Sequence, residues 1–452
     1  MLIEPQFRTE EMDALWSARA RLRRMLAFEA ELALAQAECG AIPDAAAATI
    51  AQCCQEAALD EDAVFAGAAI AGNPAIPFVQ ALTRAVTAQA PEAASYLHWG
   101  ATSQDVLDTA TMMALAEAAA IVRRDLAAAA DALAALAERH AETPIVGRTL
   151  LQQATPVTFG YKAALWAVAL DRAVDALAAM REGAAVQLGG AVGTLAAMGQ
   201  HGPAIRAALA RRLGLSDPGF CWHSVRDRVL HAGVALATVC GAAAKIGRDI
   251  QLLMQTEVAE AAEPSGEGRG GSTAMPHKRN PVDTLVAVAA GQAASGLLAS
   301  LAPSMVAEHE RAAGSWHAEW IVLPQLATLA HAAAEAIRRV AEGLAIDPAA
   351  MHENLEIHRG LLAAEALTTA LAPALGRGPA RKLVEGLCRK AQEEGTHLRV
   401  LAQAAPQVTQ NVSGERLDAI FAHASAVQAA AAEARRLVAS RNSRNASGAG
   451  RA

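Results

Sequence analysis

The stretch between Gly100 and Pro144 contains neither glycine nor proline, and this uninterrupted run constrains the fold more than any other feature. Its larger apolar residues are spaced three, four and seven apart, which is the pattern of a helix that faces a core. These residues are Met112, Leu115, Val122, Leu126, Leu133 and Leu136. At about 1.5 Å per residue, such a helix could exceed roughly 50 Å. A helix of this length outgrows a single small core, so we expect a bundle of long helices.

Further helical runs cover residues 158–182, 224–260, 281–301 and 325–345, the last of which follows Leu323–Pro324. Hydrophobic residues make up 53% of the chain but aromatic residues only 3%, because much of the apolar share is alanine. Alanine is the best intrinsic helix former, so the composition predicts an all-α protein. The segment TPIVGRTL (143–150) is the best strand candidate, and we expect it to be a connector between helices. A bundle shared between identical subunits would cover the long apolar faces.

The length of 452 residues allows more than one domain. We expect an N-terminal helical domain over residues 1–110 and a central domain of long helices over residues 111–350. A C-terminal helical domain would follow over residues 351–440. The last segment, residues 441–452, has the composition of a disordered tail.

Charge and cysteine usage narrow the setting of the protein. The formal net charge is −7 and no basic block is present, so we expect no nucleic-acid partner. The six cysteines form no C-x-x-C pair, and acidic residues stand where the apolar part of a leader would begin, which favours the cytoplasm. Residues 284–307 carry no charge, but polar residues interrupt them. We therefore expect a buried helix there and no membrane partner.

The segment GRGGSTAMPHKRNPV (268–282) is the least ordinary part of the chain, because it combines glycines and hydroxyl residues with His, Lys, Arg and Asn. Its glycines match neither a dinucleotide-binding G-x-G-x-x-G nor a P-loop. They favour a loop that opens and closes over a site.

Three other polar segments interrupt the helical pattern. In HWGATSQDVLDTA (98–110), Thr102 and Ser103 stand at the start of the long helix, where they can cap it, bind a carboxylate, or do both. GRTLLQQATPVTFG (147–160) again precedes a long helix. EHERAAGSWHAEW (308–320) holds two histidines without the spacing of a metal site, so we expect no metal.

Taken together, these segments resemble the fumarase/aspartase superfamily, which includes argininosuccinate and adenylosuccinate lyases. GSTAMPHKRN (271–280) is similar to the signature Gly-Ser-Ser-x-Met-Pro-x-Lys-x-Asn. The segments at 98–105 and 147–156 precede it, in the order in which the superfamily has its other two active-site segments. The segment GGAVGT (189–194) fits as well. The resemblance covers the whole chain and implies a three-domain, mostly helical L-aspartase-like fold. It also implies a homotetramer whose active sites combine three subunits, with no cofactor.

Members of this superfamily eliminate a group that lies β to a carboxylate. The resemblance assigns proton transfer at carbon to the second Ser of the signature, which is Thr273 here; Ser272 is the alternative. Lys278 and Asn280 would hold carboxylates and the charge that develops on them.

Two departures from the superfamily pattern concern the leaving group. The family's acid, a His after Thr in the second segment, is Leu150 here, and its partner Glu is Leu285. Because both members of the relay are apolar, the leaving group must depart without a proton. A carboxylate can do so, since its conjugate acid has a pKa of about 4. An internal carboxylate implies a lactone, and the chain resembles the lactonising branch, the bacterial 3-carboxy-cis,cis-muconate cycloisomerases. AGNPAIPFVQAL (71–82) and CWHSVRDRV (221–229) also resemble this branch.

The substrate would be a small dicarboxylate or tricarboxylate. The expected catalytic residues are Thr273, Ser272 and Lys278, and the expected substrate-binding residues are His98, Thr102, Ser103, Thr149, Gln153, Arg226, His277 and Asn280. Gln153 stands where other members of the branch tend to have His, and it cannot titrate. The alternatives are a substituted muconate such as a sulfonated one, a lyase similar to adenylosuccinate lyase, and a structural use of the scaffold.

Overall fold

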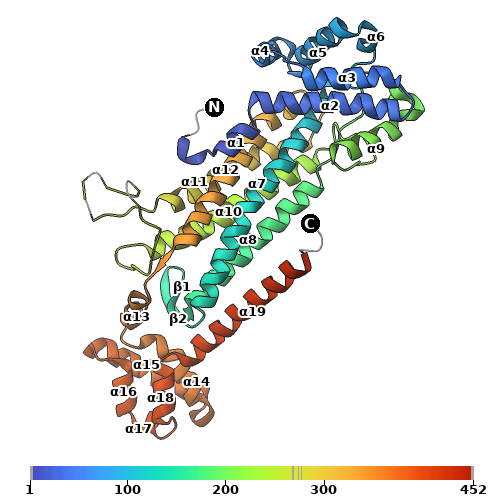
Figure 1. Cartoon of the computed structure of the whole chain (residues 1–452). Coiled ribbons are helices and arrows are strands. Elements are labelled where there is room, and N and C mark those ends of the chain that lie inside the picture. Colours follow the sequence, from blue (N-terminus) through green and yellow to red (C-terminus); the bar gives the residue numbers. More distant parts are fainter. Residues whose placement is uncertain (1–3, 267–268, 273, 276, 449–452) are drawn as a thin grey trace. The chain divides into compact units, whose positions relative to one another are not determined.

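The structure, a computed structural model, describes residues 4–266, 269–272, 274–275 and 277–448. Long helices dominate it, as the periodicity predicts (Figure 1). They are α7 (Ser103–Arg139), α8 (Phe159–Glu182), α10 (Asp227–Leu253), α11 (Val282–Leu301) and α12 (Ser315–Gly343). The all-α expectation is confirmed.

The chain forms two compact units, each assembled from three stretches that are separated in the sequence. The first contains Met1–Leu126, Arg172–Ala244 and Val286–Ala336, and the second contains Ala127–Asp171, Lys245–Leu285 and Ile337–Ala452. Each long helix contributes a segment to both units. The expected division into three consecutive domains stays a prediction.

The first unit contains a further set of helices that form its own core. They are α1 (Glu10–Leu15), α2 (Ala18–Glu38), α3 (Asp44–Glu56), α4 (Glu61–Ala71), α5 (Ala75–Gln89), α6 (Pro91–Ala94) and α9 (Gly202–Leu213), with 3₁₀ turns at Pro5–Phe7, Ala196–His201 and Ala302–Met305. Phe28, Ile50 and Phe78 are fully buried between them. Ser17 caps α2 and Asp60 caps α4, each by accepting a backbone N–H in the first turn.

The second unit ends in a cluster of helices with a separate core around Leu367, Leu371 and Leu398. Its helices are α13 (Pro348–Glu356), α14 (Ala364–Leu375), α15 (Arg377–Glu394), α16 (Leu398–Ala404), α17 (Pro406–Thr409), α18 (Gly414–Phe421) and α19 (Ala424–Gly448), with a 3₁₀ turn at Leu361–Ala363. Its strands are β1 (Pro144–Thr149), β2 (Gln152–Thr158), β3 (Ala261–Ala262) and β4 (Ala345–Ile346), paired as β1–β2 and β3–β4.

The expectation that residues 143–150 only connect helices is wrong. They form β1, which pairs antiparallel with β2 in a hairpin whose two-residue turn is Leu150–Leu151. Pairing with the next segment satisfies the backbone groups of both strands. No single-strand propensity could show that partner.

Two helix boundaries also differ from expectation. α12 begins at Ser315 and contains Pro324, whereas the sequence placed its start after that proline. α19 continues to Gly448, past residue 440, where we expected the disordered tail to begin. Arg441 explains the longer helix, because it is buried and forms ion pairs with Asp131 and Asp171.

Among the residues that the structure describes, three helices are long and apolar enough to cross a membrane, judged by length and composition alone. The most apolar windows of Asp227–Leu253, Val282–Met305 and Ser315–Gly343 are 50%, 28% and 72% buried. The expected burial of residues 284–307 is therefore not achieved within one chain. Most of the apolar surface of α11 is uncovered and available to a partner.

Candidate active site

Asp105, in the first turn of α7, joins three loops of the first unit. Its fully buried carboxylate accepts the backbone N–H groups of Thr102, Gly189 and Gly190 at 2.9–3.0 Å. His223 completes the set, with Nε2 2.8 Å from Oδ1. Burial alone would lower the pKa of His223, but the hydrogen bonds to Asp105 and Cys221 raise it to about 9. The pair therefore fixes the backbone around Thr102 and Ser103 at the start of the helix.

Thr102 has a cation beside it, but not the one that the sequence suggested. One guanidinium nitrogen of Arg311, Nη2, donates to Thr102 Oγ1 at 3.1 Å and to the carbonyl of Ala191 at 3.0 Å. Arg311 Nε is buried and has no acceptor among the described residues. Arg311 was not among the residues expected from the sequence, although it lies in the polar segment 308–320. Arg311 can bind a carboxylate next to the Thr102 hydroxyl.

His98 is held by Glu29 of α2. Its Nδ1 lies 2.6 Å from Glu29 Oε1, and the Glu29 side chain is completely buried. Burial opposes protonation of His98, yet the charge and hydrogen bond of Glu29 raise its pKa above the ordinary value. His98 also adopts a positive φ of 54°, which is uncommon for a residue with a Cβ. A protonated imidazole in a fixed orientation is suited to an anionic substrate.

The prediction that Arg226 binds substrate is not supported. Arg226 is 3% exposed, and its guanidinium bonds to Asp108 at 2.7 and 3.2 Å and to Glu319 at 2.5 and 3.0 Å. Trp222 covers one face of the guanidinium at 4.9 Å. Every charge-bearing edge is therefore occupied, so Arg226 joins α7, α10 and α12 instead of contacting substrate.

In the second unit, the turn of the β1–β2 hairpin is exposed to solvent. Leu150 is 96% exposed and Leu151 is 76% exposed, and both have positive φ, of 51° and 65°. Such a two-residue turn favours Asn and Gly, because leucine is strained in the left-handed region. Thr149 is exposed beside them. Backbone strain at exposed apolar residues indicates a functional site instead of a core.

A buried acid fixes the hairpin close to its turn. Arg148 donates to both oxygens of Glu260 at 2.7 and 2.8 Å, and Glu260 is fully buried. Asn354 of α13 also donates to Glu260, at 2.9 Å. Gln153 donates to the carbonyl of Asn354 at 3.3 Å, which leaves its own Oε1 buried without a donor among the described residues. Gln153 is therefore oriented, and its oxygen can accept a hydrogen bond from a protonated group.

The signature loop is closed on itself by Asn280. Its backbone N–H and its side-chain amide donate to the carbonyls of Gly270 and Gly271 at 2.8 and 3.2 Å. Gly270 has φ of 67°, and a Cβ there would lie 2.7 Å from the Asn280 carbonyl oxygen, so only glycine fits. His277 and Lys278 are exposed.

The candidate hydroxyls for proton transfer at carbon belong to Ser272 and Thr273. Ser272 Oγ accepts the N–H groups of Met275 at 3.1 Å and Ala274 at 3.4 Å, which stabilise negative charge on that oxygen. Thr273 lies outside the described residues. Each unit thus groups part of the expected site. His98, Thr102 and Ser103 belong to the first, and Thr149, Gln153, Ser272, His277, Lys278 and Asn280 belong to the second.

The two positions where the superfamily has its acid relay, 150 and 285, both hold leucines that are exposed in the second unit. Leu285, in the first turn of α11, is 53% exposed, and Leu150 is the hairpin tip already described. A leucine exposed to this extent is not required for packing of the chain. Neither residue can give or take a proton.

A cluster of acids around His331 joins the N-terminal segment to α7 and α12 within the first unit. His331 Nε2 lies 2.9 Å from Asp125 and 3.7 Å from Glu11, and its Nδ1 lies 2.7 Å from the Thr9 hydroxyl. These groups are close enough to hold a metal ion. However, Arg124 already donates to both carboxylates, at 2.6–2.8 Å. We assign the cluster a structural role.

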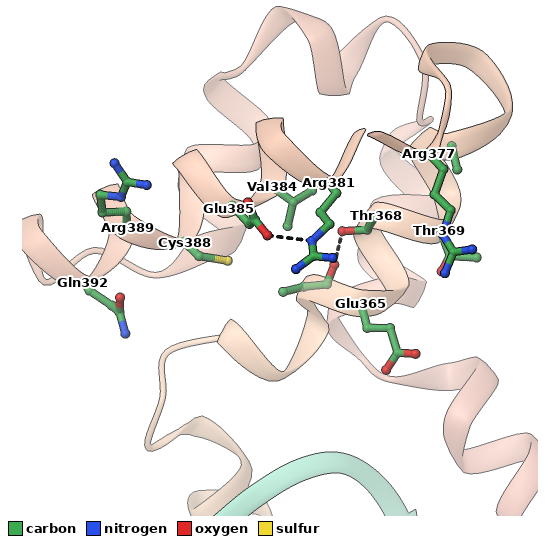
Figure 2. A pocket seen from close by; sticks show the side chains of 12 residues that line it. Glu365, Thr368, Thr369, Arg377, Arg381, Val384, Glu385, Cys388, Arg389 and Gln392 are labelled. Atoms are coloured by element: carbon green, nitrogen blue, oxygen red, sulfur yellow. Dashed lines mark hydrogen bonds and ion pairs between the residues drawn. The ribbon is translucent and has the colours of Figure 1, made fainter. Parts of the chain in front are cut away.

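A cavity of about 800 Å³ lies in the C-terminal helices, between α14 and α15 (Figure 2). Arg377, Arg381 and Arg389 lie along it, and Arg381 is paired with Glu385 at 2.7 Å. The three arginines are exposed, and none of the expected site residues lines the cavity. It is a surface groove and not the candidate active site.

The chain is similar to known proteins over most of its length. Residues 5–298 match the family described as lyase, and residues 360–437 match the adenylosuccinate lyase C-terminus. The chain is 47% identical over 421 residues to the 3-carboxy-cis,cis-muconate cycloisomerase of Bradyrhizobium diazoefficiens, covering 93% of each chain. It is 39% identical over 429 residues to the nitrosuccinate lyase of Streptomyces davaonensis, covering 93% of this chain and 90% of that one.

Among solved structures, the 3-carboxy-cis,cis-muconate lactonizing enzyme of Pseudomonas putida is similar with a TM-score of 0.89 and 42% identity. The match covers 96% of this chain and 97% of the other.

Proposed function

The chain belongs to the lyase family of the fumarase/aspartase superfamily, and we propose that it is a 3-carboxy-cis,cis-muconate cycloisomerase. In this proposal it interconverts the open-chain muconate and its lactone during aromatic breakdown. The observation that carries the proposal is the absence of a titratable group at both relay positions, Leu150 and Leu285. The 47% identity to a relative of that name supports it.

The reaction needs one C–O bond and one C–H bond to form. A carboxylate oxygen of the substrate attacks a carbon of the conjugated system, and the electron pair moves toward the neighbouring carboxyl group. The resulting aci-carboxylate collects a proton at carbon from Thr273, with Ser272 as the alternative. In the reverse direction the same oxygen, in its deprotonated form, removes that proton, and the internal carboxylate leaves as an anion without an acid.

The cationic and hydrogen-bonding side chains of the candidate site have different roles in this reaction. Lys278 stabilises the charge that develops on the substrate, and Arg311 and His98 bind its carboxylates. The Gln153 amide, Thr149, Asn280 and His277 orient the substrate.

We also propose that the active form is a homotetramer in which the site combines segments of different subunits. The uncovered apolar surface of α11 supports an association between copies of this chain. So does the distribution of the candidate residues between the two compact units.

Elimination from nitrosuccinate is the second candidate function. Nitrite also departs as a stable anion, so the apolar relay positions are compatible with it, and the relative with that name is 39% identical. A sulfonated muconate is compatible for the same reason. The additional carboxylate of carboxymuconate, for which Arg311 and His98 provide cations, favours the cycloisomerase.

The test is a substrate panel with the purified protein. We expect the ultraviolet absorbance of 3-carboxy-cis,cis-muconate to disappear as conjugation is lost, with kcat/KM at least about 100-fold above the values for nitrosuccinate and adenylosuccinate, which corresponds to about 2.7 kcal/mol. Turnover of adenylosuccinate without turnover of the muconate would contradict the proposal.

The loop variants identify the catalytic hydroxyl in the same assay. Thr273→Ala and Lys278→Ala are expected to lower kcat at least about 100-fold, the effect typical of a lost acid–base or charge-stabilising group. If Ser272→Ala alone is inactive, the assignment to Thr273 is wrong.

A further inference from the structure

A second cavity, of about 250 Å³, lies wholly within the first unit. It is lined by residues of α2, α7 and α12 and by Trp16, which directly follows α1. These residues are Trp16, Arg21, Arg24, Ala110, Thr111, Ala114, Glu319, Trp320, Leu323 and Pro324. None of the residues assigned to the proposed reaction lines it. The volume is slightly below the roughly 300–1,000 Å³ typical of sites for drug-sized ligands, so the cavity fits a small molecule.

Arg21 is the unusual residue of this cavity. Its neighbours on α2 are paired: Arg19 with Glu61, and Arg24 with Glu117 and the Leu15 carbonyl. Arg21 has no hydrogen bond or ion pair to any described residue. Desolvation lowers its pKa to about 10, so the side chain remains charged at neutral pH. Arg21 is partly buried. A cation that lines a cavity and has no counter-charge among the described residues can bind an anion there.

Aromatic rings hold this guanidinium in place. Its central carbon lies 5.4 Å from the centre of the Trp320 ring and 6.0 Å from that of Phe65. Stacking against rings leaves the N–H edge of an arginine available for a planar carboxylate. Trp16, which also lines the cavity, has a buried Nε1–H with no acceptor among the described residues. Two donors that lack acceptors therefore belong to residues lining one cavity.

The single acidic lining residue does not compete for Arg21. Glu319 gives both carboxylate oxygens to Arg226, at 2.5 and 3.0 Å. Burial raises the pKa of Glu319 to about 7, although Arg226 opposes the shift. The rest of the lining is apolar, aromatic or already hydrogen-bonded, as with Thr111, whose hydroxyl donates to the Leu107 carbonyl.

We propose that this cavity binds a small organic carboxylate with a flat apolar body, at a site separate from the proposed active site. The carboxylate pairs with Arg21, and the body of the ligand packs between Trp16, Trp320 and Leu323. The inference rests on the cavity and its unpaired donors and is independent of the reaction proposed above.

Isothermal titration calorimetry with benzoate tests the proposal. We expect about one benzoate per chain, and Arg21→Met should weaken its binding at least about tenfold, the effect of losing a charge-assisted hydrogen bond. Arg23→Met is the matched control, because Arg23 is an exposed arginine of the same helix. Benzamide, which has the same shape without the charge, should bind at least about tenfold more weakly than benzoate.

A benzoate bound in the active site is distinguished with Lys278→Ala. Retention of binding by that variant together with loss in Arg21→Met places benzoate in this cavity. The opposite pattern, equal binding by Arg21→Met and wild type, or no benzoate binding at all would overturn the proposal.

Thermal stability gives a second readout that a structural arginine would not produce. Without ligand, Arg21→Met and Arg21→Gln should change the Tm by less than about 2 °C, because the partly buried Arg21 has no hydrogen bond or ion pair to lose among the described residues. Benzoate should raise the Tm of wild type and Arg23→Met but not of either Arg21 variant. A lower Tm for both Arg21 variants would mean that Arg21 stabilises the fold, against the proposal.

Discussion

Arg311 and Arg226 carry the same charge and lie in the same unit, but their surroundings give them different roles. Arg226 is enclosed by two buried carboxylates, whereas Arg311 reaches Thr102 with its Nε unused. We expect Arg311→Met to raise KM at least about tenfold with little change in Tm. Arg226→Met should instead destabilise the fold by about 3–5 kcal/mol, because Asp108 and Glu319 remain buried without a counter-charge. Steady-state kinetics and chemical denaturation separate the two; equal loss of stability in both would contradict the assignment.

The His98–Glu29 pair predicts a pH dependence. The pKa of His98 is raised in the folded protein, so the favourable contribution of the charged pair is fully present below about pH 6.5 and is lost as pH rises through the raised pKa. Glu29→Gln should therefore move the alkaline limb of kcat/KM to lower pH and leave activity near pH 6 largely intact. Glu31→Gln is the control, because Glu31 pairs with Arg212 at a partly exposed position. An unchanged profile for Glu29→Gln would refute the pairing role.

Residues that stand together in a short motif, such as Lys278 and Asn280, can be proposed from the sequence, and their roles stay predictions. The sequence could not predict Glu29, an isolated acid in a helix 69 positions before His98. Nor could it show that Arg226 is neutralised, because Asp108 and Glu319 reach it from 118 and 93 positions away. Partners at such separations become neighbours only through the fold.

The β1–β2 hairpin is the element in which local strain is most evident. Leu151 occupies the second turn position at φ of 65°, where glycine is preferred. We expect Leu151→Gly to stabilise the protein by about 1 kcal/mol by relieving this strain. If the leucine contributes a wall of the shared site, KM should rise at the same time. Denaturation midpoints and KM test both effects, with Gln152→Gly as the control outside the positive-φ turn.

The long helices were predictable because periodicity is a local property of each segment. The start of α12 was not, because Pro324 signals a boundary by itself, while packing of Trp316 and Leu323 in the core keeps the helix continuous across it. The hairpin was missed for a related reason, since strand pairing needs a partner as well as a propensity.

The whole molecule leaves the apolar surface of α11 uncovered, and this surface carries the prediction about assembly. Ala299 is exposed on that helix, so Ala299→Arg places a charge on the surface. We expect light scattering after size exclusion to show loss of the tetramer, with kcat falling in parallel because the sites are shared. Ala66→Arg, on an exposed position of α4, is the control. A fully active monomeric Ala299→Arg would refute the shared site.

The central claim is that the enzyme closes a lactone by adding an internal carboxylate and delivering one proton to carbon. Proton NMR of the reaction of 3-carboxy-cis,cis-muconate in D₂O tests this most directly. We predict a carboxymuconolactone that carries a single deuterium on the carbon next to the carboxylate. Recovery of unchanged muconate, or an open-chain product formed by addition of water, would contradict the account.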